Sequence, residues 1–394
     1  MSESSPDELS FSLVRGDPWF RLQRAIGLIP SSGLGTVRRC VMFALVTWLP
    51  LAIWAVLSRR AFPGEVAEPL LQHFGIHVRC LLAIPLLLIA EAAGDLFPRR
   101  LLPYFITSGL VQEETRPQFL GIIRAAERMR DSWIACGGVL GLTIFLTLAG
   151  GYDSAHVHEI VWANSEGIGQ PSLGFAGWWY LFVVRPIFTF LLLVWLWRLL
   201  VGIVLFWRIS RLDLRLVPTH PDRIGGLGFL EDFPMIFGPI IFAMSAVIAS
   251  RWGHDVLYHQ AQVDSLKIPL AVFVVSMLVM FLAPLGFFSR SLRRLKHHGL
   301  LDYGALVGQH GRLVRRRWIA GEEIADAPLL QAAELGPVID TVAMYEVVAG
   351  IRVVPIGKRS LLAIALPALV PMLPVWAIQI PLKEMVMKLL GALI

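Results

Sequence analysis

Charged residues are scarce in this sequence. Asp, Glu, Lys and Arg together make up 16% of the 394 residues, whereas about 25% is typical of a soluble domain. Hydrophobic residues make up 56%, and the mean hydropathy is +0.65. A soluble fold of this composition would leave much apolar surface in water. The composition therefore predicts an integral membrane protein.

Cysteine is also rare, and several catalytic motifs are missing. Cys40, Cys80 and Cys136 each lie in or beside a different apolar segment, with no zinc or redox spacing between them. We interpret them as small apolar residues. The sequence contains neither a GxSxG nor an HExxH motif. These absences make an enzyme less expected, and the sequence predicts no cofactor.

Seven apolar segments are candidates for membrane-spanning helices, since about 20 apolar residues cross a bilayer core. The last contains Pro367, Pro371 and Pro374, so it either crosses the bilayer or re-enters it. We expect an all-α, polytopic transmembrane bundle of about seven spans, with long helices extending into the cytoplasm. The segments are Val37–Leu57, Ile76–Leu96, Trp133–Ala149, Trp178–Leu199, Met235–Ser250, Ile268–Phe288 and Leu361–Ile380.

The basic residues predict the orientation. Most Lys and Arg lie in the amino-terminal segment and in the connections after the second, fourth and sixth segments. The positive-inside rule then places the amino terminus in the cytoplasm. Because orientation also explains the net charge of +6, we expect the lipid bilayer, and not nucleic acid, as the partner of this charge.

This topology divides the chain into four regions. After Asp17-Pro18, apolar residues recur at helical spacing, which predicts an amphipathic helix on the inner membrane surface. A helix expected within 113–132 forms a cytoplasmic extension and could run unbroken into the third span. The regions are 1–36, the amphipathic cytoplasmic segment; 37–288, the bundle of six spans with a cytoplasmic loop at 219–234; 289–360, a cytoplasmic helical region; and 361–394, the last membrane segment and tail.

The most distinctive stretch is THPDRIGGLGFLEDFP, from Thr219 to Pro234. One interpretation is a ligand loop, in which the glycines and Arg223 cradle a phosphate or carboxylate and His220 and Asp222 add acid–base or metal capacity. The preferred interpretation is a shaped turn, in which Asp222 caps a bend and the glycines permit close packing. Neither a Walker loop nor a Rossmann fingerprint is present. The glycines concerned are Gly225, Gly226 and Gly228.

The segment HPDRIGGLGFL resembles a motif of a group of bacterial multi-pass membrane proteins with no established activity. A second similar region runs from Glu334 to Met385. The resemblance implies a multi-pass protein of a bacterial inner membrane. It carries over no catalytic residue.

Five ionisable residues fall inside the apolar segments, where charge is costly and usually faces protein or water. By the topology, Glu91, Asp95 and Arg198 lie in the inner half of the bilayer, and Arg79 and Arg185 in the outer half. Glu91 or Asp95 could pair with Arg198 at matching depth, either along an ion path or as a structural ion pair. Arg79 and Arg185 would favour an anion if they faced one cavity.

The predicted external loops hold six histidines, and His with carboxylates can bind zinc or copper or respond to acid. His73 and His77 could share one helix face, but the others have no firm metal spacing. Solvated loop residues remain the default interpretation. The six are His73, His77, His156, His158, His254 and His259.

Three functions compete on these observations. A channel or small-solute transporter is narrowly favoured by the number of spans, the intramembrane charges and the interrupted last segment; a channel would require a homo-oligomer to form its pore. A scaffold or sensor would use the cytoplasmic helices to dock a protein partner. A lipid-modifying enzyme would use HPDRIGGLGF as its headgroup site.

Overall fold

The computed structural model describes residues 11–31, 33–63, 69–149, 162–165, 172–322 and 336–379. Helices make up most of this part of the chain. Its strands are the two-residue β1 (Asn164–Ser165) and β2 (Ser172–Leu173), which pair in antiparallel fashion. The fold is therefore all-α apart from this one short pair.

Short 3-10 or π-helical turns join many of the helices end to end, as at Val78–Ala83, Tyr180–Val184 and Ala283–Phe288. The helices are α1 (Pro18–Ala25), α2 (Thr36–Leu57), α3 (Phe74–His77), α4 (Ile84–Thr107), α5 (Arg116–Arg130), α6 (Trp133–Ala149), α8 (Phe175–Trp179), α9 (Arg185–Ile209), α10 (Gly238–Tyr258), α11 (Lys267–Leu282), α12 (Ser289–Val314), α14 (Gly336–Ala349), α15 (Lys358–Leu369) and α16 (Leu373–Gln379).

Within the described residues, six continuous helices are long and apolar enough to cross a membrane, and the bent pair α5–α6 brings the number to seven if it counts as one span. The expected all-α bundle with six to seven long apolar helices is confirmed at this level. The six are Thr36–Leu57, Phe74–Thr107, Phe175–Ile209, Gly228–Tyr258, Val263–Ile319 and Lys358–Ile378.

The expectation that α5 runs unbroken into the third span was wrong. The two helices meet at a bend of 41°. Asp131 ends α5, and the Ser132 hydroxyl accepts the backbone N–H of Ala135 at 3.3 Å in the first turn of α6. Arg130 is buried beside the bend, where it donates to the Asp131 carboxylate at 2.6 Å and to the Ser12 carbonyl. Capping and side-chain pairing thus divide a segment whose apolar spacing is continuous.

The last apolar segment keeps the length of a span despite its prolines. α15, a 3-10 turn at Val370–Met372 and α16 follow one another without a gap. A proline leaves carbonyls of the preceding turn without an N–H donor. At this interruption Ser245 of α10 donates its hydroxyl to the Ala368 carbonyl at 2.6 Å, so a neighbouring helix satisfies the backbone there.

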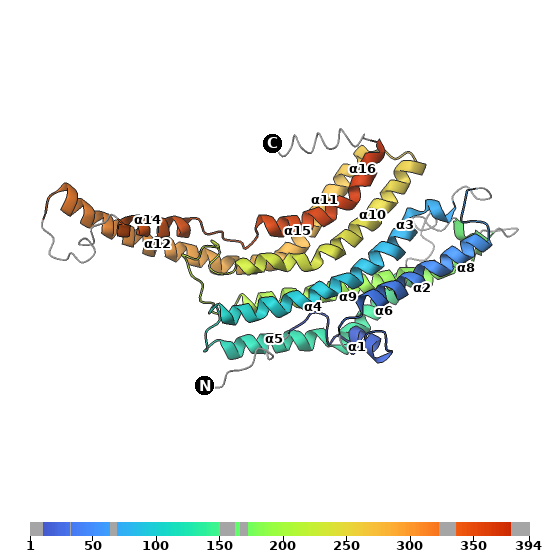
Figure 1. The fold of residues 1–394 in the computed structure, drawn as a ribbon, viewed down its shortest axis with the longest axis horizontal. Coiled ribbons are helices and arrows are strands. Elements are labelled where there is room, and N and C mark those ends of the chain that lie inside the picture. The colour runs from blue at the N-terminus through green and yellow to red at the C-terminus, as the bar shows by residue number, and fades with distance from the viewer. Residues whose placement is uncertain are drawn as a thin grey trace.

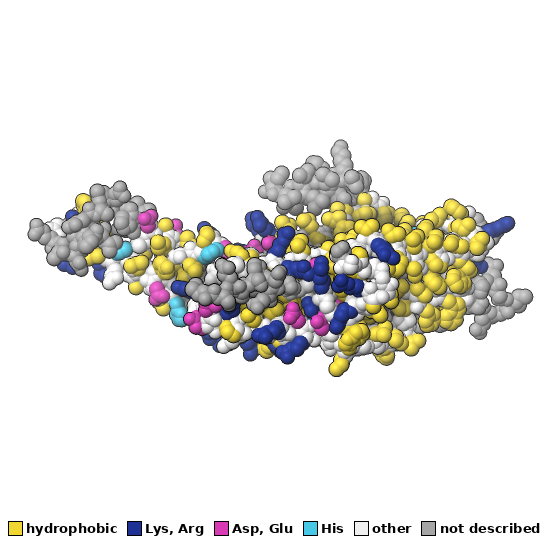
Figure 2. Space-filling view, turned by 60° about the horizontal axis from the view of Figure 1, so that its bottom comes forward, with side chains coloured by type: hydrophobic (Ala, Val, Ile, Leu, Met, Phe, Trp, Pro, Cys, Tyr) yellow, Lys and Arg dark blue, Asp and Glu magenta, His cyan; other side chains and the backbone are white. Residues whose placement is uncertain are grey.

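The long helices run side by side along the longest axis of the molecule, and α12 with α14 projects beyond them (Figure 1). Hydrophobic side chains cover one end, while Lys and Arg gather between that end and the projecting helices (Figure 2). Exposed apolar residues such as Ile134, Ile268 and Val279 belong to the apolar part. This division of the surface suits a membrane bundle with a polar extension.

The projecting part, or arm, comprises Ser289–Ile319 and α14. Its first helix continues the apolar α11, since Val263–Ile319 is one uninterrupted helical run. α14 packs along α12 at Gly299, where an added Cβ would lie 2.8 Å from Val348 Cγ1. The absence of a side chain at Gly299 therefore permits the close approach of the two helices.

We predict that Gly299→Leu separates α14 from α12, whereas Gly311→Leu, on the same helix with no atom within 4 Å of its added Cβ, leaves them packed. Leucine favours the helix at both positions by about 1 kcal/mol relative to glycine, so only the clash distinguishes the two variants. Hydrogen exchange in residues 340–349 should accelerate in Gly299→Leu alone. Equal exchange in both variants would contradict this packing.

Candidate functional site

Four buried charged side chains from four separate parts of the chain form one network. Arg198 of α9 donates to Glu91 Oε1 of α4 through both Nη atoms, each at 3.1 Å. The same guanidinium contacts Asp17 Oδ2, from Nη2 at 2.6 Å and from Nε at 3.1 Å. Arg39 of α2 pairs with the other oxygen, Glu91 Oε2. Glu91 thus bridges two arginines, and Arg198 bridges two carboxylates.

The network is balanced in charge and shielded from solvent. Arg39, Glu91 and Arg198 are at most 1% exposed, and Asp17 is 5% exposed. Arg198 also lies over the Trp195 ring, 4.8 Å from its centroid. Transferring ions out of water costs several kcal/mol each, and good pairing offsets that cost. The arrangement therefore suits a fixed structural junction.

Two hydrogen-bond donors at the edge of the network have no acceptor within the described residues. Arg39 Nε donates to Gln23 Oε1 at 2.6 Å, which joins α1 to α2. The remaining Arg39 Nη2 and Gln23 Nε2 are buried without a partner there. A water molecule or a small anion could accept hydrogen bonds from these two donors.

Sequence reasoning brought Glu91 and Arg198 together but missed Asp17, Arg39 and Gln23. The pair Asp17-Pro18 marks the start of the predicted helix, and Asp17 Oδ1 caps α1 by accepting the Phe20 N–H at 2.6 Å. Its second oxygen binds Arg198, so the helix α1 is fixed to the bundle as well as capped. Arg39 was counted among the basic residues that set orientation. Its spacing of four residues before the buried Phe43 was the available signal for an inward-facing side chain.

The predicted amphipathic surface helix corresponds to α1, but one side of α1 is buried in the protein. Phe20 and Gln23 face the protein and are buried, whereas Leu22 and Ile26 are exposed. The helix ends at Ala25, well before Ile29. A membrane-surface position would suit the exposed apolar pair, while the buried side of α1 carries part of the charge network.

Asp95 belongs to a second, more exposed cluster and does not contact Arg198. Arg15 Nε lies 3.0 Å from both Asp95 oxygens, and Arg99 pairs with Asp95 at 2.9 Å one helical turn along α4. The Leu13 N–H donates to the Gly94 carbonyl at 3.1 Å in the same region. This cluster therefore also ties the amino-terminal segment to α4.

Arg79 and Arg185 occupy the other half of their helices. The Arg79 guanidinium lies over the rings of Tyr180 and Phe188, at 5.4 and 5.6 Å from their centroids. Arg185 is the first residue of α9, directly after the π-helical turn Tyr180–Val184. The aromatic contacts account for the position of the Arg79 guanidinium.

The HPDRIGGLGF loop is organised around the Asp222 carboxylate. Its Oδ1 accepts the N–H groups of Ile224 and Gly226 at 2.8 and 3.2 Å, and Oδ2 accepts that of Gly228 at 2.8 Å. His220 Nδ1 lies 2.8 Å from Oδ1. Burial alone raises the pKa of Asp222, but these backbone and imidazole hydrogen bonds together hold it below its usual value. The carboxylate therefore stabilises the backbone of its own loop.

Three residues of this loop adopt a left-handed backbone, which favours glycine: Arg223, Gly225 and Gly226, with φ of 57°, 68° and 97°. The Arg223 carbonyl accepts the Arg352 N–H at 2.8 Å. Arg352 in turn pairs with Glu231 at 2.7 Å. The HPDRIGGLGF loop therefore contacts the segment that follows α14.

The histidines do not converge on a metal site within the described residues, where no cluster of three or more His, Cys, Asp or Glu side chains is found. His77 Nδ1 accepts the Trp48 indole N–H at 2.9 Å, and its Nε2 faces the Leu70 carbonyl at 3.1 Å. The rings of His73 and His254 stack at 5.1 Å, and those of His254 and His259 meet edge to face at 5.4 Å. His156 and His158 lie outside the described residues.

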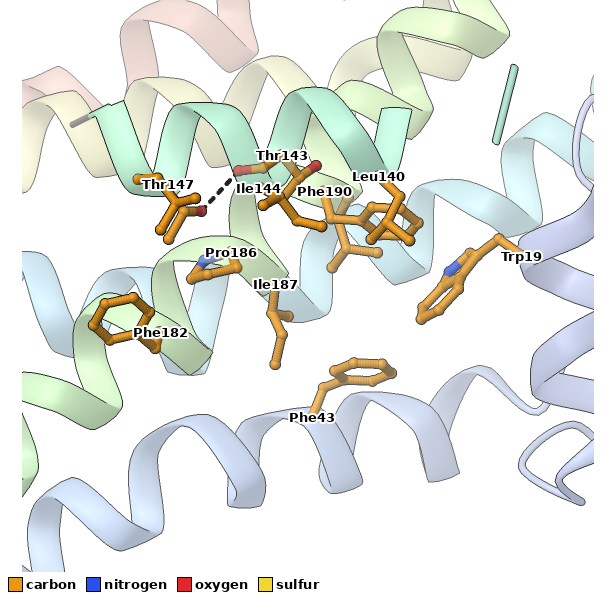
Figure 3. Close-up of a pocket in the computed structure, with 12 residues that line it drawn as sticks. Trp19, Phe43, Leu140, Thr143, Ile144, Thr147, Phe182, Pro186, Ile187 and Phe190 are labelled. Carbon is orange, nitrogen blue, oxygen red and sulfur yellow. Dashed lines mark hydrogen bonds between the residues drawn. The ribbon is translucent and has the colours of Figure 1, made fainter. Parts of the chain in front are cut away.

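An apolar groove of about 350 Å³ lies between α2, α6 and α9 (Figure 3). Phe43, Ile187 and Leu140 are among the side chains that line it. The hydroxyls of Thr143 and Thr147 donate to carbonyls of their own helix at 2.8 and 2.7 Å. The groove therefore suits hydrocarbon and offers little to a polar solute.

In comparisons with known proteins, no family model, no curated protein and no solved structure matches the chain.

We predict that Glu91→Gln lowers the free energy of unfolding by about 3–5 kcal/mol, because it leaves two buried arginines without their shared carboxylate. The same substitution at Glu322 removes an exposed pair with Arg316, whose side chains are 48% and 56% exposed. That change should stay within about 1 kcal/mol. Thermal unfolding in detergent measures both variants, and similar Tm shifts would argue against the network as a stabilising junction.

Asp222→Asn should destabilise the protein at neutral pH by about 1–3 kcal/mol, since a charged acceptor of backbone N–H groups is lost. The folded pKa of Asp222 is lowered, so its stabilising effect is present above the unfolded pKa of about 3.9. It is lost as the pH falls through the folded pKa. The difference in Tm between wild type and variant should therefore shrink in acid. The exposed Asp302→Asn serves as the control, and a pH-independent difference for Asp222→Asn would refute the assignment.

Proposed function

We propose that the chain is a multi-pass scaffold or sensor of a bacterial inner membrane, with its amino terminus and arm in the cytoplasm, where the arm docks a protein partner. The observation that carries this proposal is the continuity of the arm with a candidate span. Val263–Ile319 is one helical run, and α14 packs on its projecting half. A contact at the arm is therefore linked mechanically to a helix of the bundle.

The surface of the arm supports a protein partner. Leu301, Trp318 and Ile319 are 60–78% exposed, and Val342 and Met344 of α14 are exposed as well. These apolar side chains belong to the projecting part, away from the apolar end of the bundle (Figures 1 and 2). A contiguous patch of apolar side chains exposed to water is typical of protein interaction sites.

The buried charges favour this function over transport. A transport path needs charged groups that water or solute can reach, whereas Glu91 and Arg198 are 1% exposed and bind each other directly. A transporter or channel remains the competing function. The observation that favours it most is that Arg39 Nη2 and Gln23 Nε2 have no hydrogen-bond acceptor among the described residues. An interfacial enzyme gains less support, because Asp222 is engaged by its own loop.

Site-specific photo-crosslinking in native membranes tests the proposal. A photoreactive residue in place of Trp318 should yield one discrete protein adduct. The same residue in place of Ile268, which is equally exposed but lies in the apolar α11, should yield lipid adducts only.

The competing function is tested in proteoliposomes under an imposed voltage at two pH values. The scaffold proposal expects no ion flux above empty liposomes. Flux that is lost on Glu91→Gln in folded protein, together with no protein adduct at position 318, would replace it with transport.

A further inference from the structure

A polar groove of about 730 Å³ lies where the arm leaves the bundle. One wall is the segment Ser210–Leu216, which follows α9, and the other is the first part of α12. One wall directly follows the candidate span Phe175–Ile209, and the other continues the apolar α11 within the run Val263–Ile319. The groove therefore lies at the boundary between the apolar part and the arm. It is separate from the buried charge network and from the Asp222 carboxylate.

The groove concentrates positive charge. Arg290, Arg294 and His298 line it from α12 at intervals of four residues, and Arg211 lines it from the opposite wall. Side chains four apart share one helix face, with about 6 Å of rise between them. Asp213 is the only carboxylate among the lining residues. The lining thus carries three permanent cations and one carboxylate, with Arg211 and Asp213 on the same wall.

These arginines differ from others near the same boundary. Arg15 and Arg99 both pair with Asp95, and Arg116 pairs with Glu113. Arg290 and Arg294 form no ion pair within the part of the chain that the structure describes. Like charges four apart destabilise a helix, and a bound anion would relieve that repulsion.

The HPDRIGGLGF loop shapes this groove. A Cβ at Gly225 would lie 2.8 Å from Leu295 Cδ2 and 3.2 Å from Leu216 Cβ. Leu295 and Leu216 belong to opposite walls of the groove. Gly225 also accepts the Val217 N–H through its carbonyl at 3.2 Å. The missing side chain at Gly225 therefore sets how closely α12 approaches the segment after α9.

We propose that this groove binds a phosphate-bearing anion, held by Arg211, Arg290 and Arg294, and that the glycines of HPDRIGGLGF form the support that brings the two walls together. Guanidinium groups match phosphate oxygens in bidentate geometry, which suits a groove lined by several arginines. The phosphate belongs either to a lipid headgroup at the membrane surface or to a soluble ligand. The proposal does not depend on the scaffold function.

The test uses the full chain in phosphatidylcholine nanodiscs and two matched variants. Arg294→Gln removes a cation that lines the groove. Arg293→Gln removes a cation one residue away that is also exposed but does not line the groove. Because the net charge changes equally, general attraction of anions to a basic surface affects both variants alike.

Titration calorimetry with inorganic pyrophosphate should give saturable binding that Arg294→Gln weakens about tenfold and Arg293→Gln changes less than about twofold. Native mass spectrometry should show whether phosphatidic acid is retained over phosphatidylcholine with the same dependence. Pyrophosphate binding identifies a soluble phosphate ligand, and retention of phosphatidic acid alone identifies a lipid headgroup. Equal losses in the two variants, or no binding of either probe by the wild type, would overturn the proposal.

Discussion

The bundle depends on one buried set of ion pairs. Glu91 of α4 binds Arg198 of α9 and Arg39 of α2, and Arg198 also binds Asp17 at the start of α1. None of these charges could remain in an apolar interior alone. Each helix therefore needs the others in place, and the amino-terminal segment is required to complete the set. Van der Waals packing between apolar helices in lipid does not by itself specify such an arrangement.

The same logic applies at the polar end of the bundle. Asp222 accepts hydrogen bonds from the backbone of its loop, and Gly225 leaves room for Leu295 of α12. Arg352 binds the same loop and pairs with Glu231. These contacts determine where the arm begins and how it leaves the bundle. The proposed anion groove is a consequence of this junction, since its two walls meet at Gly225. Structural residues of the motif thus create a site whose charged groups lie outside the motif.

Much of this could be predicted from the sequence, because apolar length and periodicity report helices directly. The pairing of Glu91 with Arg198 followed from their matching depth. Asp17 and Arg39 were missed because of their positions in the sequence. Asp17 precedes the first apolar segment and Arg39 lies near its start, and charged side chains at such positions are normally solvated. The bend between α5 and α6 was missed because Asp131 and Ser132 interrupt hydrogen bonding without interrupting apolar spacing. The groove cations come from segments about 80 residues apart, and no local pattern joins them.

The central claim is that Arg198 fixes the amino-terminal segment to the bundle through Asp17, and a double-mutant cycle tests it most directly. Asp17→Asn keeps a residue able to cap α1, and Arg198→Met keeps an unbranched chain of similar length. The free energies of unfolding of the two single variants and the double variant should give a coupling energy above about 1 kcal/mol. Additive effects, within about 0.5 kcal/mol, would mean that the two side chains act independently and would contradict the account.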